Sequence, residues 1–133
     1  MPSSALRITD AGLHAFKDKE PNNHIPNATL ITVGATVDGS IEATQDRDVF
    51  KLHASSPKTR VILRKQFNAA VDVYDHVENL ITSDGQRGDK TVTLTFESTP
   101  GSIYYIVVKS SLGALRPIDE RYHGDYQLTV RSE

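Results

Sequence analysis

The pattern of apolar and polar residues after residue 28 is typical of β-strands. Residues 92–96 read Val, Thr, Leu, Thr and Phe, and residues 126–130 read Tyr, Gln, Leu, Thr and Val. A period of two places one set of side chains on a core and the other in water. The run 103–108, Ile-Tyr-Tyr-Ile-Val-Val, has no polar side, which predicts a central strand covered on both faces.

Short segments of this kind follow one another along most of the chain. Strands are expected at 29–33, 36–43, 48–54, 59–65, 70–75, 80–83, 91–97, 102–110 and 126–131. Turn-forming residues punctuate the chain at 38–39, 84–85, 87–89, 100–101 and 124–125. Strands that recur at a spacing of roughly 10 residues, without a long helical pattern between them, predict an all-β antiparallel sandwich or barrel. The longest irregular stretch, 112–123, is expected to be an exposed crossover loop.

The beginning of the chain does not show this strand pattern. Leu13 and Phe16 have helical spacing, although Gly12 weakens a helix. These features fit either a short helix or a mobile arm. We therefore expect an N-terminal arm or linker at 1–19 and a β-domain at 20–133.

Composition and charge exclude several classes of protein. The length of 133 residues is typical of a single domain. Fifteen Lys and Arg against 17 Asp and Glu give a net charge of −2, which lacks the basic excess that nucleic-acid modules use to neutralise phosphates. The longest apolar run is far shorter than the roughly 18 residues of a membrane span. Without cysteine the chain has no disulfide framework, thiolate metal site or cysteine nucleophile.

No motif in the sequence indicates catalysis, and we expect a protein that is not an enzyme. The five histidines have no spacing that would place two of them on one helix face as metal ligands. No serine occupies a Gly-x-Ser-x-Gly elbow. Arg87-Gly88-Asp89 is the tripeptide that integrins read, but Gly-Asp is ordinary turn chemistry and we interpret it as a turn.

Six motifs in order along the chain resemble one known family. They are Glu20-Pro-Asn-Asn23, Val37-Asp-Gly-Ser-Ile41, Asp46-Arg-Asp-Val-Phe50, Val71-Asp-Val-Tyr-Asp75, Gly101-Ser-Ile-Tyr-Tyr-Ile-Val-Val108 and Gly124-Asp-Tyr-Gln-Leu-Thr-Val130. The chain is similar over residues 20–131 to the bacterial pre-peptidase C-terminal domain, whose relatives include the collagen-binding domains of clostridial collagenases. The resemblance implies a jelly-roll-like β-sandwich of about 8–9 strands. It also implies a domain without catalysis of its own, covalently linked to the catalytic domain of a secreted bacterial hydrolase, often a peptidase. We expect a monomer.

Oxygen-bearing side chains form two candidate groups of calcium ligands. In an extended segment, alternate residues project the same way, so Asp18, Glu20 and Asn22 would form one group, together with Asn23. A second group, Asp46 with Asp48, opens a predicted strand. Calcium takes about six to eight oxygens from carboxylates, amides and backbone carbonyls.

The calcium-binding members of the family use the corresponding acidic and Asn residues. The resemblance therefore implies a Ca²⁺ site made by Asp18, Glu20, Asn22, Asn23, Asp46 and Asp48. Asn23 stands where the family prefers Asp, which removes one negative charge and should weaken the affinity. In the alternative interpretation, the first group is solvated and the second caps a turn.

The sequence thus predicts a calcium-stabilised accessory domain that aids substrate attachment, secretion or domain spacing. Its partner would be an extracellular protein or polysaccharide, and the alternative is a stand-alone carbohydrate- or protein-binding jelly roll. The N-terminus lacks the features of a signal peptide, and the resemblance places a secreted enzyme before it. Of the tyrosines, Tyr74, Tyr126 and one of Tyr104 and Tyr105 are expected to point inward, which leaves too few for an aromatic platform.

Overall fold

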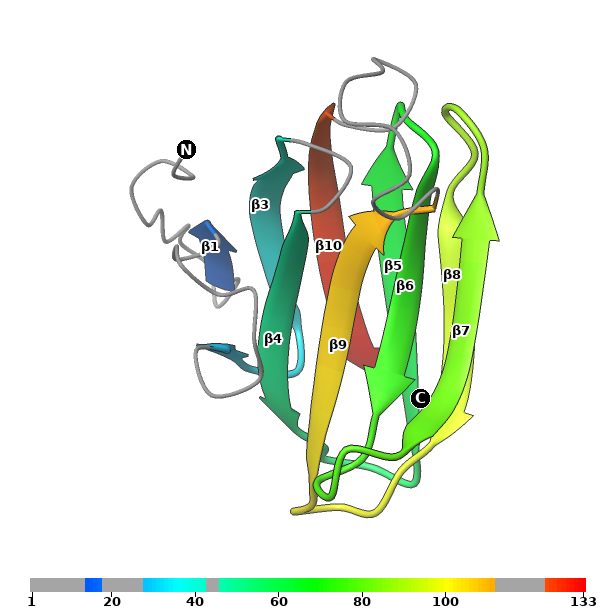
Figure 1. The fold of residues 1–133 in the computed structure, drawn as a ribbon. Helices are drawn as coiled ribbons and strands as arrows, with labels where there is room; N and C mark the ends of the chain where they lie inside the picture. Colours follow the sequence, from blue (N-terminus) through cyan, green and yellow to red (C-terminus); the bar gives the residue numbers. More distant parts are fainter. Residues whose placement is uncertain (1–13, 18–27, 43–45, 112–123) are drawn as a thin grey trace.

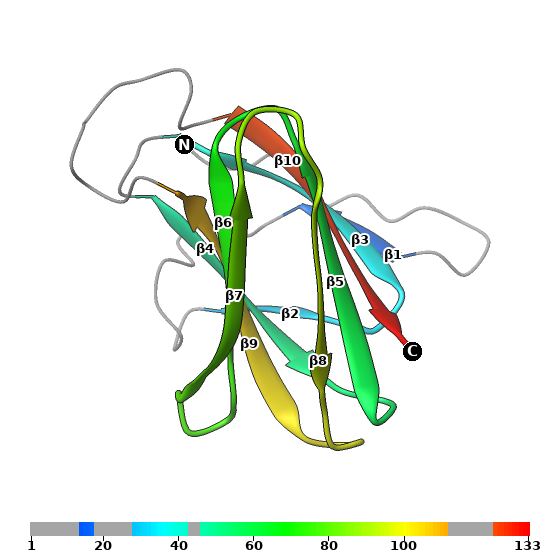
Figure 2. The ribbon, with the colours of Figure 1, turned by 90° about the vertical axis from the view of Figure 1, so that its right-hand side faces the viewer.

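The computed structural model of the chain describes residues 14–17, 28–42, 46–111 and 124–133. Within these ranges it contains ten β-strands and no helix. The strands form two five-stranded sheets that face each other in a sandwich (Figures 1 and 2). The predicted all-β sandwich is therefore confirmed.

Each sheet takes strands from along the whole chain. Sheet A contains, in spatial order, β1 (His14–Lys17), β3 (Ala35–Ile41), β10 (Gly124–Ser132), β5 (Lys58–Lys65) and β8 (Val92–Glu97). Sheet B contains β2 (Thr29–Ile31), β4 (Arg47–His53), β9 (Ile103–Ser110), β6 (Ala69–Tyr74) and β7 (Leu80–Gln86). Neighbouring strands are antiparallel except at one edge of each sheet, where β1 lies parallel to β3 and β2 parallel to β4.

All nine strands expected from the alternation are present, with ends shifted by a few residues. The tenth strand, β1, lies in the segment for which the sequence left a helix or an arm open, and the helix is wrong for residues 14–17. Three expected turns are also wrong, because 38–39 and 84–85 lie within β3 and β7, and 124–125 opens β10. The loop expected at 112–123 lies outside the described residues.

The two other expected turns are confirmed, and both place a glycine in the left-handed region. Gly88 has φ 56° and Gly101 has φ 88°. The backbone N–H of Lys90 donates to the carbonyl of Arg87 over 3.2 Å, which closes the 87–90 turn. The side chain of Asn68 accepts from the N–H of Gly88 at 2.7 Å. The Arg-Gly-Asp tripeptide is thus part of a β-turn, as interpreted from the sequence.

Alternating side chains from both sheets fill one continuous core. In β8 the apolar residues are buried and the intervening residues exposed, as the sequence predicts. The ring of Phe96, from sheet A, lies 5.2 Å from that of Tyr104, from sheet B. The Tyr104 hydroxyl accepts a hydrogen bond of 2.9 Å from the backbone N–H of Thr99, so its polar end is satisfied as well.

A buried hydrogen bond joins the sheets. Asp48 points inward from β4 and is fully buried, and the hydroxyl of Tyr126 on β10 donates to its Oδ2. Tyr126 pairs with Gly39 on the neighbouring strand. A Cβ at position 39 would overlap with the Tyr126 ring at Cζ and Oη, so glycine makes room for this ring. The contact fixes β10 of sheet A against β4 of sheet B.

Lys65 forms a second polar link between the sheets. Its side chain is buried, and Nζ donates to the carbonyls of Gln86 and Gly88, each over 2.8 Å. Burial lowers the pKa of Lys65, and the nearby charge of Asp89 opposes that shift. The end of β5 in sheet A is thereby tied to the end of β7 in sheet B.

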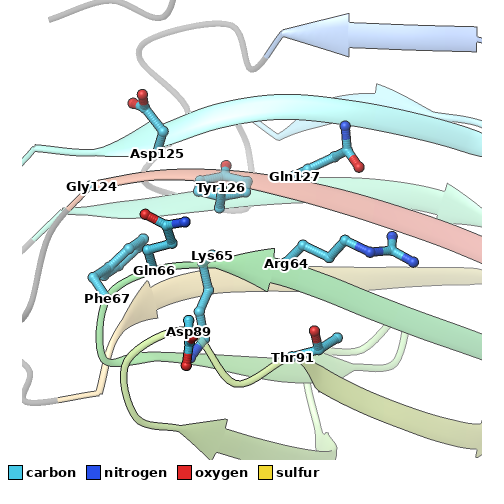
Figure 3. Close-up of a pocket in the computed structure, with 10 residues that line it drawn as sticks. All are labelled: Arg64, Lys65, Gln66, Phe67, Asp89, Thr91, Gly124, Asp125, Tyr126 and Gln127. Carbon is cyan, nitrogen blue, oxygen red and sulfur yellow. The ribbon is translucent and has the colours of Figure 1, made fainter.

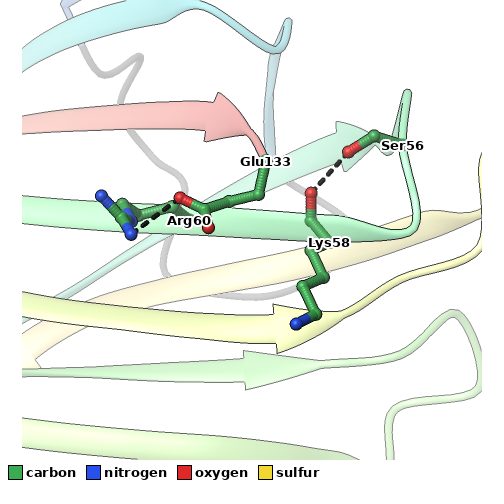
Figure 4. Close-up of polar contacts among 4 residues, drawn as sticks. All are labelled: Ser56, Lys58, Arg60 and Glu133. Carbon is green, nitrogen blue, oxygen red and sulfur yellow. Dashed lines mark hydrogen bonds and ion pairs between the residues drawn. The ribbon is translucent and has the colours of Figure 1, made fainter.

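The C-terminal end of β10 is held against β5 (Figure 4). The carboxylate of Glu133 lies 2.8 Å from the guanidinium of Arg60, and its backbone N–H donates to the carbonyl of Lys58 over 2.9 Å. The same carbonyl accepts from the hydroxyl of Ser56 at 2.5 Å. Because the Arg60–Glu133 pair is partly exposed, its contribution to stability is modest.

Asp75 organises the turn between β6 and β7. Its Oδ1 accepts from the backbone N–H groups of Asn79 at 2.9 Å and of Val77 at 3.0 Å. The bond from Asn79 is the main cause that lowers the pKa of Asp75, while desolvation opposes the shift. Glu78 in this turn has φ 68°, a conformation uncommon outside glycine.

We expect Tyr126→Phe to lower the free energy of unfolding by about 1–3 kcal/mol, because the buried Asp48 carboxylate loses a donor while the packing is kept. Urea unfolding followed by fluorescence or circular dichroism measures the difference. Tyr105→Phe, on an outer face, is the matched control. An unchanged midpoint for Tyr126→Phe would show that the cross-sheet hydrogen bond contributes nothing.

We expect Asp75→Ala to lower stability near neutral pH and to have less effect in acid. A carboxyl whose folded pKa is depressed contributes its full stability above the ordinary value of 3.8 and loses it as the pH falls through the folded value. Urea unfolding between pH 7 and pH 2 measures the gap between the variant and the wild type. Asp125→Ala, at another exposed aspartate, is the control. A gap that stayed constant across this range would contradict the role given to the charged carboxylate.

Candidate functional site

The predicted calcium ligands fall into described and undescribed parts of the chain. Asp18, Glu20, Asn22 and Asn23 lie outside the described residues. Asp46 lies just before β4, and its Oδ2 accepts from the backbone N–H of Glu42 over 2.8 Å. Asp48 lies two residues further along, inside the sandwich, where it accepts from Tyr126.

Glu42 is a carboxylate that the sequence analysis did not include. It follows β3 directly, it is exposed, and its Oε2 accepts from the hydroxyl of Ser40 over 2.7 Å. The contact of its backbone N–H with the Asp46 carboxylate places these two acidic residues near each other at the connection between β3 and β4. The only sequence signal was its place at the end of a predicted strand, a few residues before Asp46.

The strand β1 points toward the part of the molecule that contains Glu42 and Asp46. Its last residue, Lys17, pairs with Asp38, and β1 runs parallel to β3 toward the end that carries Glu42 (Figure 1). Among the residues that the structure describes, no three His, Cys, Asp or Glu residues are grouped so as to hold a metal. Within the described ranges, the acidic residues that could contribute to a calcium site at this connection are therefore Glu42 and Asp46.

The outer face of sheet B carries a row of side chains that crosses all five strands. Register partners in adjacent strands place these residues side by side, and we call them the transverse row: Leu30, Lys51, Tyr105, Tyr74 and Leu80. The two leucines at its ends are 58% and 57% exposed. The three residues between them are half-buried. The row is therefore an accessible strip that is mainly aromatic and aliphatic.

Tyr74 lies on this outer face, so its expected inward orientation is wrong. Val71 and Val73 fill the core from the same strand, and the period of two places Tyr74 on the opposite side. The expectations that one of Tyr104 and Tyr105 points inward and that Tyr126 lies in the core are confirmed, since Tyr104 and Tyr126 are core residues. Two adjacent tyrosines, 74 and 105, are thus available on one face, which the sequence analysis did not foresee.

A second row of register partners lies beside the transverse row, on the side nearer the β3–β4 connection. It contains Val49, Val107 and Asp72. Val49 and Val107 face outward in this row and are nevertheless only 2% exposed. Beside them, the Asp72 carboxylate lies 2.7 Å from Nζ of Lys109, and the Tyr74 hydroxyl donates to the same carboxylate over 3.5 Å. The ion pair and the Tyr74 hydroxyl therefore meet at one carboxylate, that of Asp72.

The outer face of sheet A has a different character. Its central register positions are occupied by Thr36, Thr129, Ile62 and Thr93, and the hydroxyls of Thr36 and Thr129 lie 3.3 Å apart. Among the described residues of this face, no aromatic side chain points outward. Of the two faces, the one on sheet B is the better candidate for binding through apolar contact.

No protein-family model matches the sequence, and a comparison with curated proteins finds no match. Solved structures do resemble the fold. The pre-peptidase C-terminal domain of a collagenase from Bacillus anthracis has a TM-score of 0.62 and 21% identity, over 83% of this chain and 100% of that domain. The resemblance seen in the sequence is therefore confirmed as a likeness of fold.

Two further structures share the sandwich at lower identity. PliG from Aeromonas hydrophila, a periplasmic inhibitor of g-type lysozyme, has a TM-score of 0.54 and 16% identity, over 78% of this chain and 97% of that one. CorA from Methylomicrobium album BG8, a surface-associated copper-binding protein, has a TM-score of 0.57 and 8% identity, over 80% of this chain and 100% of that one. In the described ranges of the present chain, no helix has the length and apolar character needed to cross a membrane.

Proposed function

We propose that this chain is a non-catalytic accessory domain of a secreted bacterial hydrolase, a peptidase in particular, and that it attaches the enzyme to a protein substrate. The support is the match over the full length of a domain that belongs to a collagenase. The outer face of sheet B, with its transverse row, is the surface that performs the attachment. This role places the protein outside the cell, linked covalently to a catalytic domain.

The transverse row is the observation that carries the proposal. Five strands spaced about 4.8 Å apart give a strip of about 19 Å, which matches roughly six residues of an extended polypeptide. Tyr74 and Tyr105 offer large contact areas at a low cost in side-chain entropy, and Lys51 between the apolar groups can donate to backbone carbonyls. A strip of this size supports weak, repeated binding, which suits attachment to an insoluble polymer.

Calcium is the second part of the proposal. Glu42 and Asp46 would hold the ion from the sandwich, and Asp18, Glu20, Asn22 and Asn23 are the candidate donors before β2. Bound calcium would supply positive charge that neutralises these carboxylates and fastens residues 18–23 to the β3–β4 connection. Asp48 is not among these donors, because it is buried in the sandwich and accepts from Tyr126.

The second candidate function is a stand-alone module that binds a protein or a carbohydrate. PliG and CorA favour it, because one is a lysozyme inhibitor and the other a surface-associated copper-binding protein, and nearly the whole of each chain matches this one. The coding sequence on either side of this chain separates the two functions. An adjoining catalytic domain supports the first, and its absence from both sides supports the second.

We expect the domain to be retained on insoluble collagen, and Tyr74→Ala and Tyr105→Ala each to lower the retained fraction at least several-fold. Removing a central aromatic contact from a binding surface costs about 1–3 kcal/mol. A pull-down on collagen, chitin and cellulose measures retention, with Thr36→Ala and Thr93→Ala on sheet A as controls. Retention on none of these polymers, or equal loss in the sheet A variants, would contradict attachment through the transverse row.

We expect added calcium to raise the melting temperature and to protect residues 10–23 from proteolysis, relative to samples in EDTA. An ion that binds only the folded state at 100 times its Kd stabilises it by about 2.7 kcal/mol. Asp46→Asn should reduce the calcium-dependent shift, whereas Asp125→Asn should leave it unchanged. Superimposable thermal scans of the wild type in calcium and in EDTA would remove calcium from the proposal.

A further inference from the structure

A groove of about 620 Å³ lies on sheet A, where β5 ends and β10 begins (Figure 3). The pairing of β5 with β8 stops at Leu63 and Val92, whereas β10 remains paired with β5 as far as Lys65. The strands separate beyond that point and leave a hollow between segments 64–67 and 89–91. Its volume is in the range of pockets that hold small ligands.

The floor of the groove is apolar and rigid. Phe67 and Tyr126 contribute to its lining although their side chains are almost fully buried. A Cβ at Gly124 would lie 3.2 Å from Cδ1 of Phe67, so glycine keeps this part of the floor open. The hydrogen bonds of Tyr126 to Asp48 and of Lys65 to the Gln86 carbonyl hold the two strands beneath it. Because little of either side chain is exposed, the floor is a rigid apolar backing, and the rim supplies most of the surface that a ligand can contact.

The rim carries both hydrogen-bond donors and acceptors. Six of its side chains are exposed: Arg64, Gln66, Asp89, Thr91, Asp125 and Gln127. Guanidinium, amide and carboxylate groups are planar and can hold two neighbouring hydroxyl groups at once. Arg64 and Gln127 are register partners on adjacent strands, so their spacing is set by the sheet.

The charges of the groove select against strongly charged ligands. An anion attracted by Arg64 would meet Asp89 and Asp125, and a cation attracted by these aspartates would meet Arg64. The ammonium of Lys65 donates to two backbone carbonyls and extends toward Asp89, which balances its charge locally (Figure 3). A hydroxyl group donates and accepts, so a neutral ligand rich in hydroxyls can satisfy both kinds of rim residue.

We propose that this groove binds a neutral oligosaccharide, whose hydroxyl groups exchange hydrogen bonds with the planar polar side chains of the rim. The site is separate from the transverse row, because β5, β10 and the segments 66–67 and 89–91 line the groove, whereas the row lies on the outer face of sheet B. A domain with both sites can hold a protein and a glycan at once. The two sites can therefore be tested independently.

The test is a titration of the ¹⁵N-labelled chain with neutral hexasaccharides of glucose and of N-acetylglucosamine, in β-1,4 and α-1,4 linkages. Anionic hexagalacturonate and cationic chitosan hexamer are the charged probes. We expect at least one neutral probe to shift the amide resonances of residues 64–67, 91 and 125–127, with a Kd in the millimolar range or below. Arg64→Ala and Gln127→Ala should each weaken this binding at least fivefold.

Arg131→Ala, on the same face outside the groove, and Tyr105→Ala, on the transverse row, should leave glycan binding unchanged. The spectra of the variants also report whether each remains folded, so loss of binding is not confused with loss of structure. The inference is overturned if no neutral probe shifts these resonances, if a charged probe binds more tightly, or if the shifts map to sheet B. Collagen retention of Arg64→Ala would be unaffected in any of these cases, which keeps the outcome distinct from that of the proposed attachment function.

Discussion

The hydrogen bond between Tyr126 and Asp48 is the constraint on which the surfaces of this protein depend. A fully buried carboxylate is costly unless it receives donors, so the sandwich is more stable when β10 presents its tyrosine to β4. Each of these strands also carries outward-facing residues of one candidate site: Lys51 on β4 and Gln127 on β10. The internal contact therefore fixes the relative positions of two external surfaces.

Alternation in the sequence was sufficient to predict most of the fold. Each strand with a clear period of two is present, because burial of one face is a local property of the chain. Gly39 shows where local reasoning stops. Asp-Gly at 38–39 is ordinary turn chemistry, but the glycine is in mid-strand because the ring of Tyr126, distant in sequence, occupies the space of a side chain. That requirement cannot be read without the register between β3 and β10.

The candidate sites were also predictable only in part, because they depend on which strands lie side by side and in which register. The even spacing of Ala69, Val71 and Val73 could have shown that Tyr74 faces outward, and this signal was available in the sequence. The transverse row itself depends on the register of five strands, including the parallel pairing of β2 with β4, which no pattern reveals. Glu42 was missed because its relation to Asp46 arises from a backbone contact rather than from spacing.

The position of the two terminal strands gives the sandwich an unequal resistance to mechanical load. β10 lies in the centre of sheet A, bonded on both sides to β3 and β5, whereas among the described strands β1 lies at the edge and pairs with β3 alone. Tension applied through β10 must shear two ladders at once, while tension through β1 acts on a single short ladder. A tether on the β10 side would therefore anchor the domain more firmly, and one on the β1 side would yield first.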